Sequence, residues 1–271
     1  MGGNQKISLA EEVKSAPKEY VLSINLRING LSFLLRDKNG RQLQLEHFEW
    51  SSKTDWSGSL NKLRELVENS ELSKKDFHQT SIYLQAPHSF ILPDKAAGDK
   101  LEKIYHTYLG LEQHQVFSQE LFPKAYLVYG LPNEVYQLII NEFPKASWKH
   151  CSAAFIARSM DKVENGQVLF VNHHSGYIEV VSIKNKKLEA HNYFPYGNTD
   201  EYLFNLISFA RQTGMNIEKL HIHLKGQIIE NSKLHQSVLK YFPNVLFEAV
   251  IRADMGAVNQ EFIEAVNYEN R

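Results

Sequence analysis

The sequence contains one pattern twice, and this repeat constrains the fold more than any other feature. Residues 20–50 read YVLSINLRINGLSFLLRDKNGRQLQLEHFEW, and residues 167–196 read QVLFVNHHSGYIEVVSIKNKKLEAHNYFPY. The segment VLSIN in the first copy aligns with VLFVN in the second, and Gly30 aligns with Gly176. Because the copies begin 147 residues apart, we expect one α/β domain for each copy.

Each copy predicts three strands, a helix and a fourth strand. β-Branched and apolar runs, with an Asn-Gly turn in the first copy, indicate the strands, and apolar residues at helical spacing indicate the helices. In the first copy the strands are expected at 20–26, 30–37, 42–50 and 81–85, with a helix after Asp55. In the second they are expected at 168–172, 176–184, 187–193 and 220–224, with a helix capped by Asn198 or Thr199.

Further helices and strands follow each copy. We expect helices at 99–113, from Pro132 and at 153–161, strands at 126–129 and 147–151, and, after the second copy, a helix at 230–242, a strand at 244–250 and a mixed tail. The predicted domains are therefore a disordered leader at 1–18, a first domain at 19–151 with an insertion at 90–124, and a second domain at 152–271. The leader is polar, without the apolar run of a signal peptide or a membrane span, so we expect a cytoplasmic protein with no direct membrane insertion.

Charge and cysteine content exclude several classes of function. The net charge of −1 and a pI near 6.9 give no basic face for nucleic acid. The single cysteine, Cys151, excludes an internal disulfide and any site made of several cysteines. His150 precedes it directly, but neighbouring side chains diverge, so we interpret Cys151 as a structural thiol rather than a nucleophile.

Three strands, a helix and a strand, twice over, resemble the actin-like ATPase superfamily, whose two ribonuclease H-like domains face a cleft. The segments LVYGLPNEV at 127–135 and CSAAF at 151–155 are similar to the actin-like proteins of bacterial pilus-assembly platforms. As a whole the chain resembles a bacterial domain-of-unknown-function family with this fold. The resemblance implies a nucleotide held between the first hairpins of the two domains. A ribonuclease H-like nuclease is set aside, since neither first strand carries the metal-binding aspartate.

The same resemblance implies that each first hairpin begins Asp-x-Gly, yet Asn25 and Arg27 stand there in the first copy and Asn172 and His174 in the second. An asparagine lacks the charge that organises Mg²⁺, and a bulky side chain replaces the glycine that lets backbone amides approach a phosphate. Arg27 could still pair with a phosphate. The equivalent cofactor-binding positions are Asn25, Arg27, Gly30, Asn172, His173, His174, Gly176 and Gly226, and Gln85 ends the strand where relatives place a water-orienting side chain.

The sequence has 12 histidines, and His174 and His223 are expected to approach one another across neighbouring strands. A zinc site is one reading, but no carboxylate or cysteine accompanies them at ligand spacing, so we interpret them as ordinary strand histidines and predict no metal site. Aromatic residues at 193–202 are interpreted as interdomain packing, with a peptide-docking surface as the alternative.

These observations predict a degenerate actin-like scaffold or protein-docking module with an unidentified protein partner, no catalytic residue and no cofactor. The alternative is a divergent nucleotide-binding ATPase or small-molecule kinase that uses ATP and Mg²⁺ in the interdomain cleft. A third hypothesis is a cleft for a non-nucleotide ligand lined by Arg27, His173 and His174. The cellular role and the oligomeric state are left open.

Overall fold

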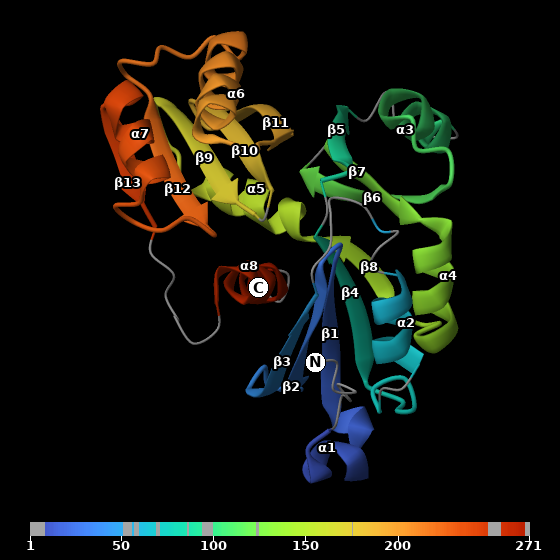
Figure 1. Cartoon of the computed structure of the whole chain (residues 1–271). Helices are drawn as coiled ribbons and strands as arrows, with labels where there is room; N and C mark the ends of the chain where they lie inside the picture. The colour runs from blue at the N-terminus through green and yellow to red at the C-terminus, as the bar shows by residue number, and fades with distance from the viewer. Residues whose placement is uncertain are drawn as a thin grey trace. The chain divides into compact units, whose positions relative to one another are not determined.

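The chain folds into two compact units, Met1–Cys151 and Ser152–Arg271, each of mixed α/β structure (Figure 1). The computed structural model describes residues 9–50, 56, 60–68, 71–85, 87–93, 100–122, 125–174, 176–248 and 256–268, and the side chains of 256–260 are not described. Asp55, the predicted helix cap, lies outside these residues. Within the described residues, no helix is both long enough and apolar enough to cross a bilayer.

The main sheet of the first unit has five strands in the order β3-β2-β1-β4-β8. They are β1 (Tyr20–Arg27), β2 (Gly30–Asp37), β3 (Gln42–Glu49), β4 (Gln79–Gln85) and β8 (Ser147–His150). The pairs β1–β2 and β2–β3 are antiparallel, as two short turns require, and β1, β4 and β8 run parallel. This is the arrangement that the repeat predicts for its first copy.

The rest of the first unit contains a second, three-stranded sheet in the order β5-β7-β6. Its strands are β5 (Ser89–Pro93), β6 (His114–Phe122) and β7 (Ala125–Pro132), and the helices of the unit are α1 (Glu11–Ser15), α2 (Leu60–Glu68), α3 (Leu101–Leu109), α4 (Asn133–Glu142) and a short 3₁₀ turn, Pro17–Glu19. Sequence reasoning missed β5, β6 and α1. The expected disorder of residues 1–18 is wrong from Leu9 onward, because Leu9 and Val13 are buried.

The second unit repeats the topology of the first main sheet. Its order is β11-β10-β9-β12-β13, with β9 (Gln167–His173), β10 (Tyr177–Lys184), β11 (Lys187–Pro195), β12 (His221–Gly226) and β13 (Asn244–Phe247). β9 again pairs antiparallel with β10 and parallel with β12. Both copies of the sequence repeat therefore form the same three-stranded meander followed by a parallel crossover.

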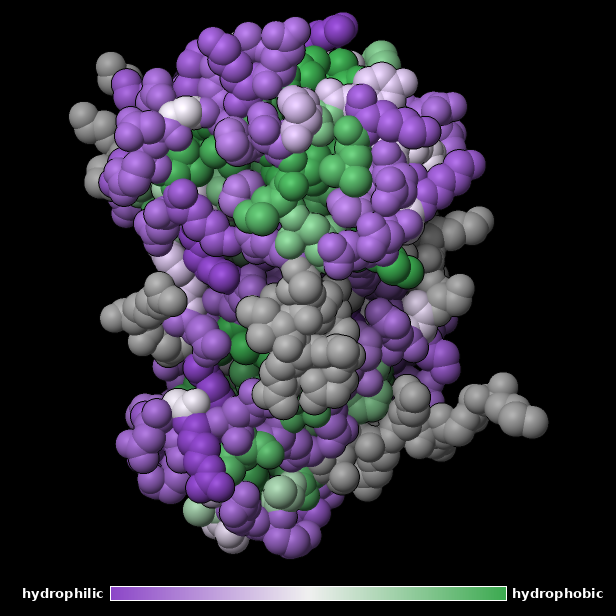
Figure 2. All heavy atoms as spheres, turned by 90° about the vertical axis from the view of Figure 1, so that its left-hand side faces the viewer, coloured by the Kyte–Doolittle hydropathy of each residue, from purple (hydrophilic) through white to green (hydrophobic). Residues whose placement is uncertain are grey.

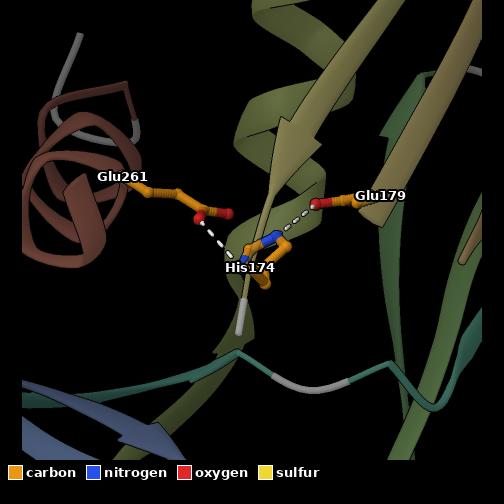
Figure 3. Close-up of side chains that lie close together, drawn as sticks. All are labelled: His174, Glu179 and Glu261. Carbon is orange, nitrogen blue, oxygen red and sulfur yellow. Dashed lines mark ion pairs between the residues drawn. The ribbon is translucent and has the colours of Figure 1, made fainter. Parts of the chain in front are cut away.

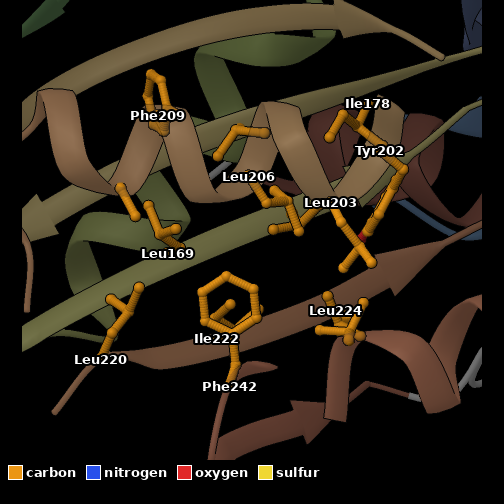
Figure 4. Packing of buried hydrophobic residues seen from close by; sticks show 14 of the residues in the cluster. Leu169, Ile178, Tyr202, Leu203, Leu206, Phe209, Leu220, Ile222, Leu224 and Phe242 are labelled. Atoms are coloured by element: carbon orange, nitrogen blue, oxygen red, sulfur yellow. The ribbon is translucent and has the colours of Figure 1, made fainter. Parts of the chain in front are cut away.

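Helices cover both faces of the second sheet. They are α5 (Cys151–Asp161), α6 (Thr199–Gln212), α7 (Lys233–Tyr241) and α8 (Gly256–Tyr268). α6 and α7 pack on one face, where Leu169, Leu206, Ile222 and Phe242 are fully buried in the core shown in Figure 4. On the other face, the Lys225 ammonium of β12 lies over a ring of α5 and binds a carboxylate of α8. The tail expected after residue 250 was therefore wrong in part, because α8 is a helix packed against this sheet.

Alternation along β9 determines which polar residue reaches which face. Leu169 and Val171 point into the core under α6, and His173 continues that row. Asn172 belongs to the opposite row, and His174, just past the strand, follows it. Two adjacent histidines are thus placed in two different environments.

Candidate functional site

The hairpin of β1 and β2 in the first unit is closed by Arg27 and Gly30, which pair directly across the turn. The Arg27 side chain is buried and turns inward onto the sheet. Its guanidinium donates to Ser32 Oγ at 2.9 Å and to the Phe48 carbonyl at 3.4 Å, and Nη2 lies 3.2 Å from His47 Nδ1. A buried guanidinium bonded to three neighbours is a structural clamp between β1, β2 and β3. This placement differs from the phosphate-facing one that the resemblance implies.

Asn25, which stands at the aspartate of the Asp-x-Gly pattern that the resemblance implies, is fully buried among polar side chains. Its amide donates to Gln85 Oε1 at 2.9 Å, and the Cys151 thiol contacts its oxygen at 3.9 Å. Gln85 is itself buried. Asn25, Gln85 and Cys151 are uncharged side chains, and their contacts join the end of β1 to the end of β4 and to Cys151. This geometry agrees with Cys151 as a structural thiol.

The first histidine of the second hairpin, His173, is bonded on both ring nitrogens. Nδ1 lies 2.9 Å from the Lys225 carbonyl oxygen, and Nε2 lies 2.8 Å from the Tyr202 hydroxyl, with the two rings stacked. A carbonyl can only accept, so Nδ1 carries the proton and Nε2 accepts from Tyr202. Burial lowers the pKa of His173 to about 4, which keeps the ring neutral in this arrangement.

The second histidine, His174, lies between two buried carboxylates (Figure 3). Nε2 is 3.6 Å from Glu179 Oε2, and Nδ1 is 3.7 Å from Glu261 Oε2. Glu179 comes from β10 and Glu261 from α8, and the three side chains are 8%, 1% and 6% exposed. We call His174, Glu179 and Glu261 the His-Glu-Glu cluster. One potential ligand atom from each lies within 4.8 Å of the others.

The two carboxylates of the cluster are held in different electrostatic states. Burial opposes ionisation of Glu179, but the imidazoles of His174 and His191 outweigh this cost and hold its pKa below the usual value. His191 Nε2 is only 2.8 Å from Glu179 Oε1. Burial raises the pKa of Glu261, His174 opposes the rise and the Glu179 charge adds to it. The pKa of Glu179 is thus lowered and that of Glu261 raised, so Glu261 is the carboxylate that keeps a proton more readily.

Asn172 adds an amide to the edge of the cluster. It lies opposite Glu179 in the β9–β10 register and is 1% exposed. The amide favours the ionised form of Glu261 slightly, although neither of its polar atoms makes a hydrogen bond of good geometry. A buried amide without a well-formed hydrogen bond destabilises the fold, so Asn172 is a candidate for binding a group other than the protein's own atoms.

A second carboxylate on α8 is fully neutralised nearby. Glu264 binds Arg158 of α5, and Lys225 donates to its Oε2 at 2.9 Å. These ion pairs, together with the cluster, fix α8 on the sheet of the second unit. The two acidic residues of α8 therefore have different partners: Glu264 binds two cationic side chains, and Glu261 faces the imidazole of His174.

Three glycines stand at the predicted cofactor positions, and two of them, Gly30 and Gly226, are in places where other atoms of the protein leave no room for a side chain. A methyl on Gly226, where φ is +88°, would overlap the His173 carbonyl and lie 2.6 Å from Asn172 Oδ1. A methyl on Gly30 would overlap the Arg27 guanidinium and the Phe48 carbonyl. Gly176 has φ +85° and makes the turn between β9 and β10.

The expected approach of His174 and His223 is wrong. His223 pairs in register with Phe170 and binds Glu248 at 3.4 Å, whereas His174 lies past the end of β9. The carboxylates that do accompany His174 were missed, because Glu261 is distant in sequence. Glu179 had a signal of its own, as the one acidic residue of the apolar strand YIEVVSIK.

The aromatic residues at 193–202 make contacts within the second unit. Phe194 and Tyr196 border the core under α6, and Tyr196 makes an edge contact with Tyr202. The Tyr193 hydroxyl is 2.6 Å from Ser152 Oγ at the start of α5.

Comparison with known proteins identifies the fold. A family model described as "Protein of unknown function (DUF3822)" matches residues 12–245. A crystal structure from Bacteroides thetaiotaomicron, of a protein with actin-like ATPase fold and unknown function, is 18% identical with a TM-score of 0.77, covering 89% of this chain and 94% of that one. No curated protein sequence matches the chain.

A second similar structure is the PilM-PilN type IV pilus biogenesis complex. It is 10% identical with a TM-score of 0.56, covering 93% of this chain and 99% of that one. Likeness at these identities establishes the fold and not the activity. The predicted actin-like fold is thereby confirmed, and so is the resemblance to a family of unknown function.

Proposed function

The chain belongs to the DUF3822 family of proteins of unknown function, and from this premise we propose that it is a non-catalytic, actin-like protein-docking module. The observation that carries the proposal is the state of Arg27. Its guanidinium is 4% exposed and bound to Ser32, His47 and Phe48, so the position that is glycine in the superfamily is filled by a structural clamp.

The second hairpin supports the same conclusion by the side chain at the equivalent position. His174 stands where the first copy has Arg27, and it is buried between Glu179 and Glu261. A bulky side chain at this position prevents backbone amides from approaching a phosphate closely. Neither Asn25 nor Asn172 supplies the carboxylate that organises Mg²⁺ in phosphoryl transfer.

The docking role rests on an exposed apolar surface of the second unit. Figure 2 shows hydrophobic residues gathered among hydrophilic ones on the side of the unit that carries α7 and β13. Large apolar side chains are exposed on α7, at Leu239 and Tyr241, on β13, at Leu246, and just before α7, at Ile229, which is 77% exposed. β13 is also an edge strand of its sheet. Exposed apolar residues next to the edge strand of a sheet are typical of a surface that binds another protein.

The structural relatives make such a role reasonable for this fold. One of them is the PilM-PilN type IV pilus biogenesis complex. We extend that kind of role, and no particular partner, to this chain. A protein partner, rather than a small-molecule substrate, is therefore what we expect it to bind.

Nucleotide binding is the first test. The melting temperature of the purified chain is measured with ATP and Mg²⁺, with Mg²⁺ alone and with adenosine, and phosphate release is followed in parallel. We expect ATP with Mg²⁺ to match Mg²⁺ alone, with no phosphate released. A ligand present at 100 times its Kd would stabilise the fold by about 2.7 kcal/mol, which such a melt resolves easily. Stabilisation by ATP together with phosphate release would refute the proposal.

The docking surface is tested by paired variants. Ile229→Asp and Leu246→Asp place charge in the proposed surface, and Phe204→Asp, at an α6 residue that is 69% exposed, is the matched control. In affinity purification from the native host, a partner is expected with wild type and Phe204→Asp and not with the other two. A partner captured equally by all four proteins would place the docking surface elsewhere.

A further inference from the structure

The His-Glu-Glu cluster joins three elements of the second unit that are far apart in sequence. His174 follows β9, Glu179 lies on β10 and Glu261 lies on α8, and all three side chains are buried (Figure 3). We propose that the second unit binds one divalent cation of the zinc or manganese type through His174, Glu179 and Glu261. This role is independent of the docking function proposed above.

The donor set fits a borderline first-row cation. One imidazole nitrogen and two carboxylates are ligands that Zn²⁺ and Mn²⁺ both accept, whereas sites for soft cations use thiolates. Ca²⁺ and Mg²⁺ prefer an all-oxygen shell, so the imidazole argues against them. Zn²⁺ is the first choice, because it accepts three protein ligands with a fourth position left for water.

The donor atoms of the cluster lie close together but do not yet converge on one point. The nitrogen–oxygen distances of 3.6 and 3.7 Å exceed hydrogen-bond length and start from different ring nitrogens of His174. Four ligands at metal distances near 2.1 Å stand about 3.4 Å apart in a tetrahedron. His174 turns Nε2 toward Glu179 and Nδ1 toward Glu261, so a single cation binds one ring nitrogen and the farther carboxylate rotates toward it. The three ligand atoms lie within 4.8 Å of one another, so rotation of one glutamate side chain is enough to bring its carboxylate to the cation.

Asn172 is the second, independent observation. It is 99% buried next to Glu261 and opposite Glu179, and neither its amide nitrogen nor its amide oxygen has a hydrogen bond of good geometry. An amide oxygen is a good additional ligand or a partner for a metal-bound water. Binding of a cation would therefore satisfy a buried amide that the protein itself leaves poorly bonded.

The groups around the cluster behave as a supporting shell. His191 holds the other oxygen of Glu179 at 2.8 Å, which orients that carboxylate in the way outer residues orient metal ligands. Arg158 and Lys225 both bind Glu264 of α8, which holds this helix beside the cluster. A divalent cation would balance the charge of the two carboxylates and would join α8 to the β9–β10 hairpin.

The test compares matched variants of the full chain. Protein freed of metal with EDTA is dialysed against Zn²⁺ or Mn²⁺, and bound metal is counted by elemental analysis. Co²⁺ is added to a separate sample, and the intensity of its visible d–d bands reports whether the bound ion is four-coordinate or six-coordinate. The variants are His174→Gln and Glu261→Gln, and the control is Glu264→Gln, a carboxylate of the same helix that is bound to Arg158 and Lys225.

We expect one equivalent of Zn²⁺ or Mn²⁺ in wild type and in Glu264→Gln, and a loss of at least tenfold in affinity in His174→Gln and Glu261→Gln. The metal is expected to raise the melting temperature of wild type but not of Glu261→Gln. If His174→Gln does not fold, the nearly isosteric Glu261→Gln decides. Absence of stoichiometric metal in wild type, or equal binding by Glu261→Gln, would overturn the proposal and leave the cluster as a proton-bridged ion pair.

Discussion

Replacement of Gly226 by alanine separates two costs that the structure assigns to this residue. Gly226 has φ +88°, and Gly166 has the same φ, but a methyl on Gly166 meets nothing within 4 Å. A left-handed alanine costs about 1–2 kcal/mol, and the lost freedom of the unfolded chain returns about 0.4–1 kcal/mol of this. Gly166→Ala is therefore expected to destabilise the protein by about 1 kcal/mol.

Gly226→Ala carries the additional cost of the tight approach of β12 to β9. Its methyl would overlap the His173 carbonyl and lie 2.7 Å from the His173 nitrogen, and backbone atoms cannot rotate away as a side chain does. Overpacking of this kind costs about 1–3 kcal/mol, so Gly226→Ala is expected to lose about 2–4 kcal/mol in all.

The measurement is urea unfolding followed by circular dichroism and by tryptophan fluorescence. All three tryptophans, Trp50, Trp56 and Trp148, lie in the first unit. Tryptophan fluorescence therefore reports the unfolding of the first unit, whereas circular dichroism reports the unfolding of both units. The shift of Gly226→Ala is expected in the circular dichroism transition. Equal stabilities of Gly226→Ala and Gly166→Ala would refute the argument that Gly226 is required by close packing, and would reopen a ligand-binding role for it.

Three further substitutions test the polar contacts. Arg27→Lys cannot bond all three partners of the guanidinium at once, so the free energy of unfolding should fall by about 1–3 kcal/mol without any change in the response to ATP; an unchanged stability would contradict the clamp. Tyr202→Phe removes the donor to His173 and should cost about 1–3 kcal/mol in a urea titration, and a neutral result would rule out the assigned tautomer. The hydrogen bond from His223 lowers the pKa of Glu248 to about 2. Burial opposes this shift and Lys162 supports it. The ionised Glu248 therefore stabilises the fold fully above about pH 4.5, and this stabilisation is lost as the pH falls toward 2. After allowance for its partial exposure this amounts to about 1–2 kcal/mol, and Glu248→Gln should flatten the acid limb of a plot of urea midpoint against pH; an unchanged limb would show that the pair contributes nothing.

Local pattern was sufficient to predict the repeated part of the fold. Alternating and β-branched runs with short turns predict both meanders, because register within a meander is set by turn length and by the apolar face. The strand β6, HQVFSQELF, was missed because it mixes polar and apolar residues and lies half-buried against β7. The helix α8 was missed because its role depends on contacts with Lys225 and Arg158, which no local pattern encodes.

The candidate site could be predicted only where chain neighbours determine it. Adjacent residues on a strand face opposite sides, so the separation of His173 from His174 follows from the sequence. The same rule places Glu179 beside Asn172, once the β9–β10 register is known. The contribution of Glu261 could not be predicted, since helix docking is decided by tertiary packing and its partner is 87 residues away.

The two copies of the hairpin differ in their polar residues, and this difference indicates which of them can bind a ligand. The residue opposite Asn25 is Ser32, while the residue opposite Asn172 in the second copy is Glu179. The first hairpin thus closes with neutral partners and a buried arginine clamp that needs no ligand. The second concentrates two carboxylates and an imidazole beside an amide without a good hydrogen bond, an arrangement that burial makes costly unless a proton or a cation completes it. A ligand-dependent property of this protein is therefore expected in the second unit, and exchange of Glu179 for glutamine should abolish it while the corresponding substitution at Ser32, to alanine, leaves it intact.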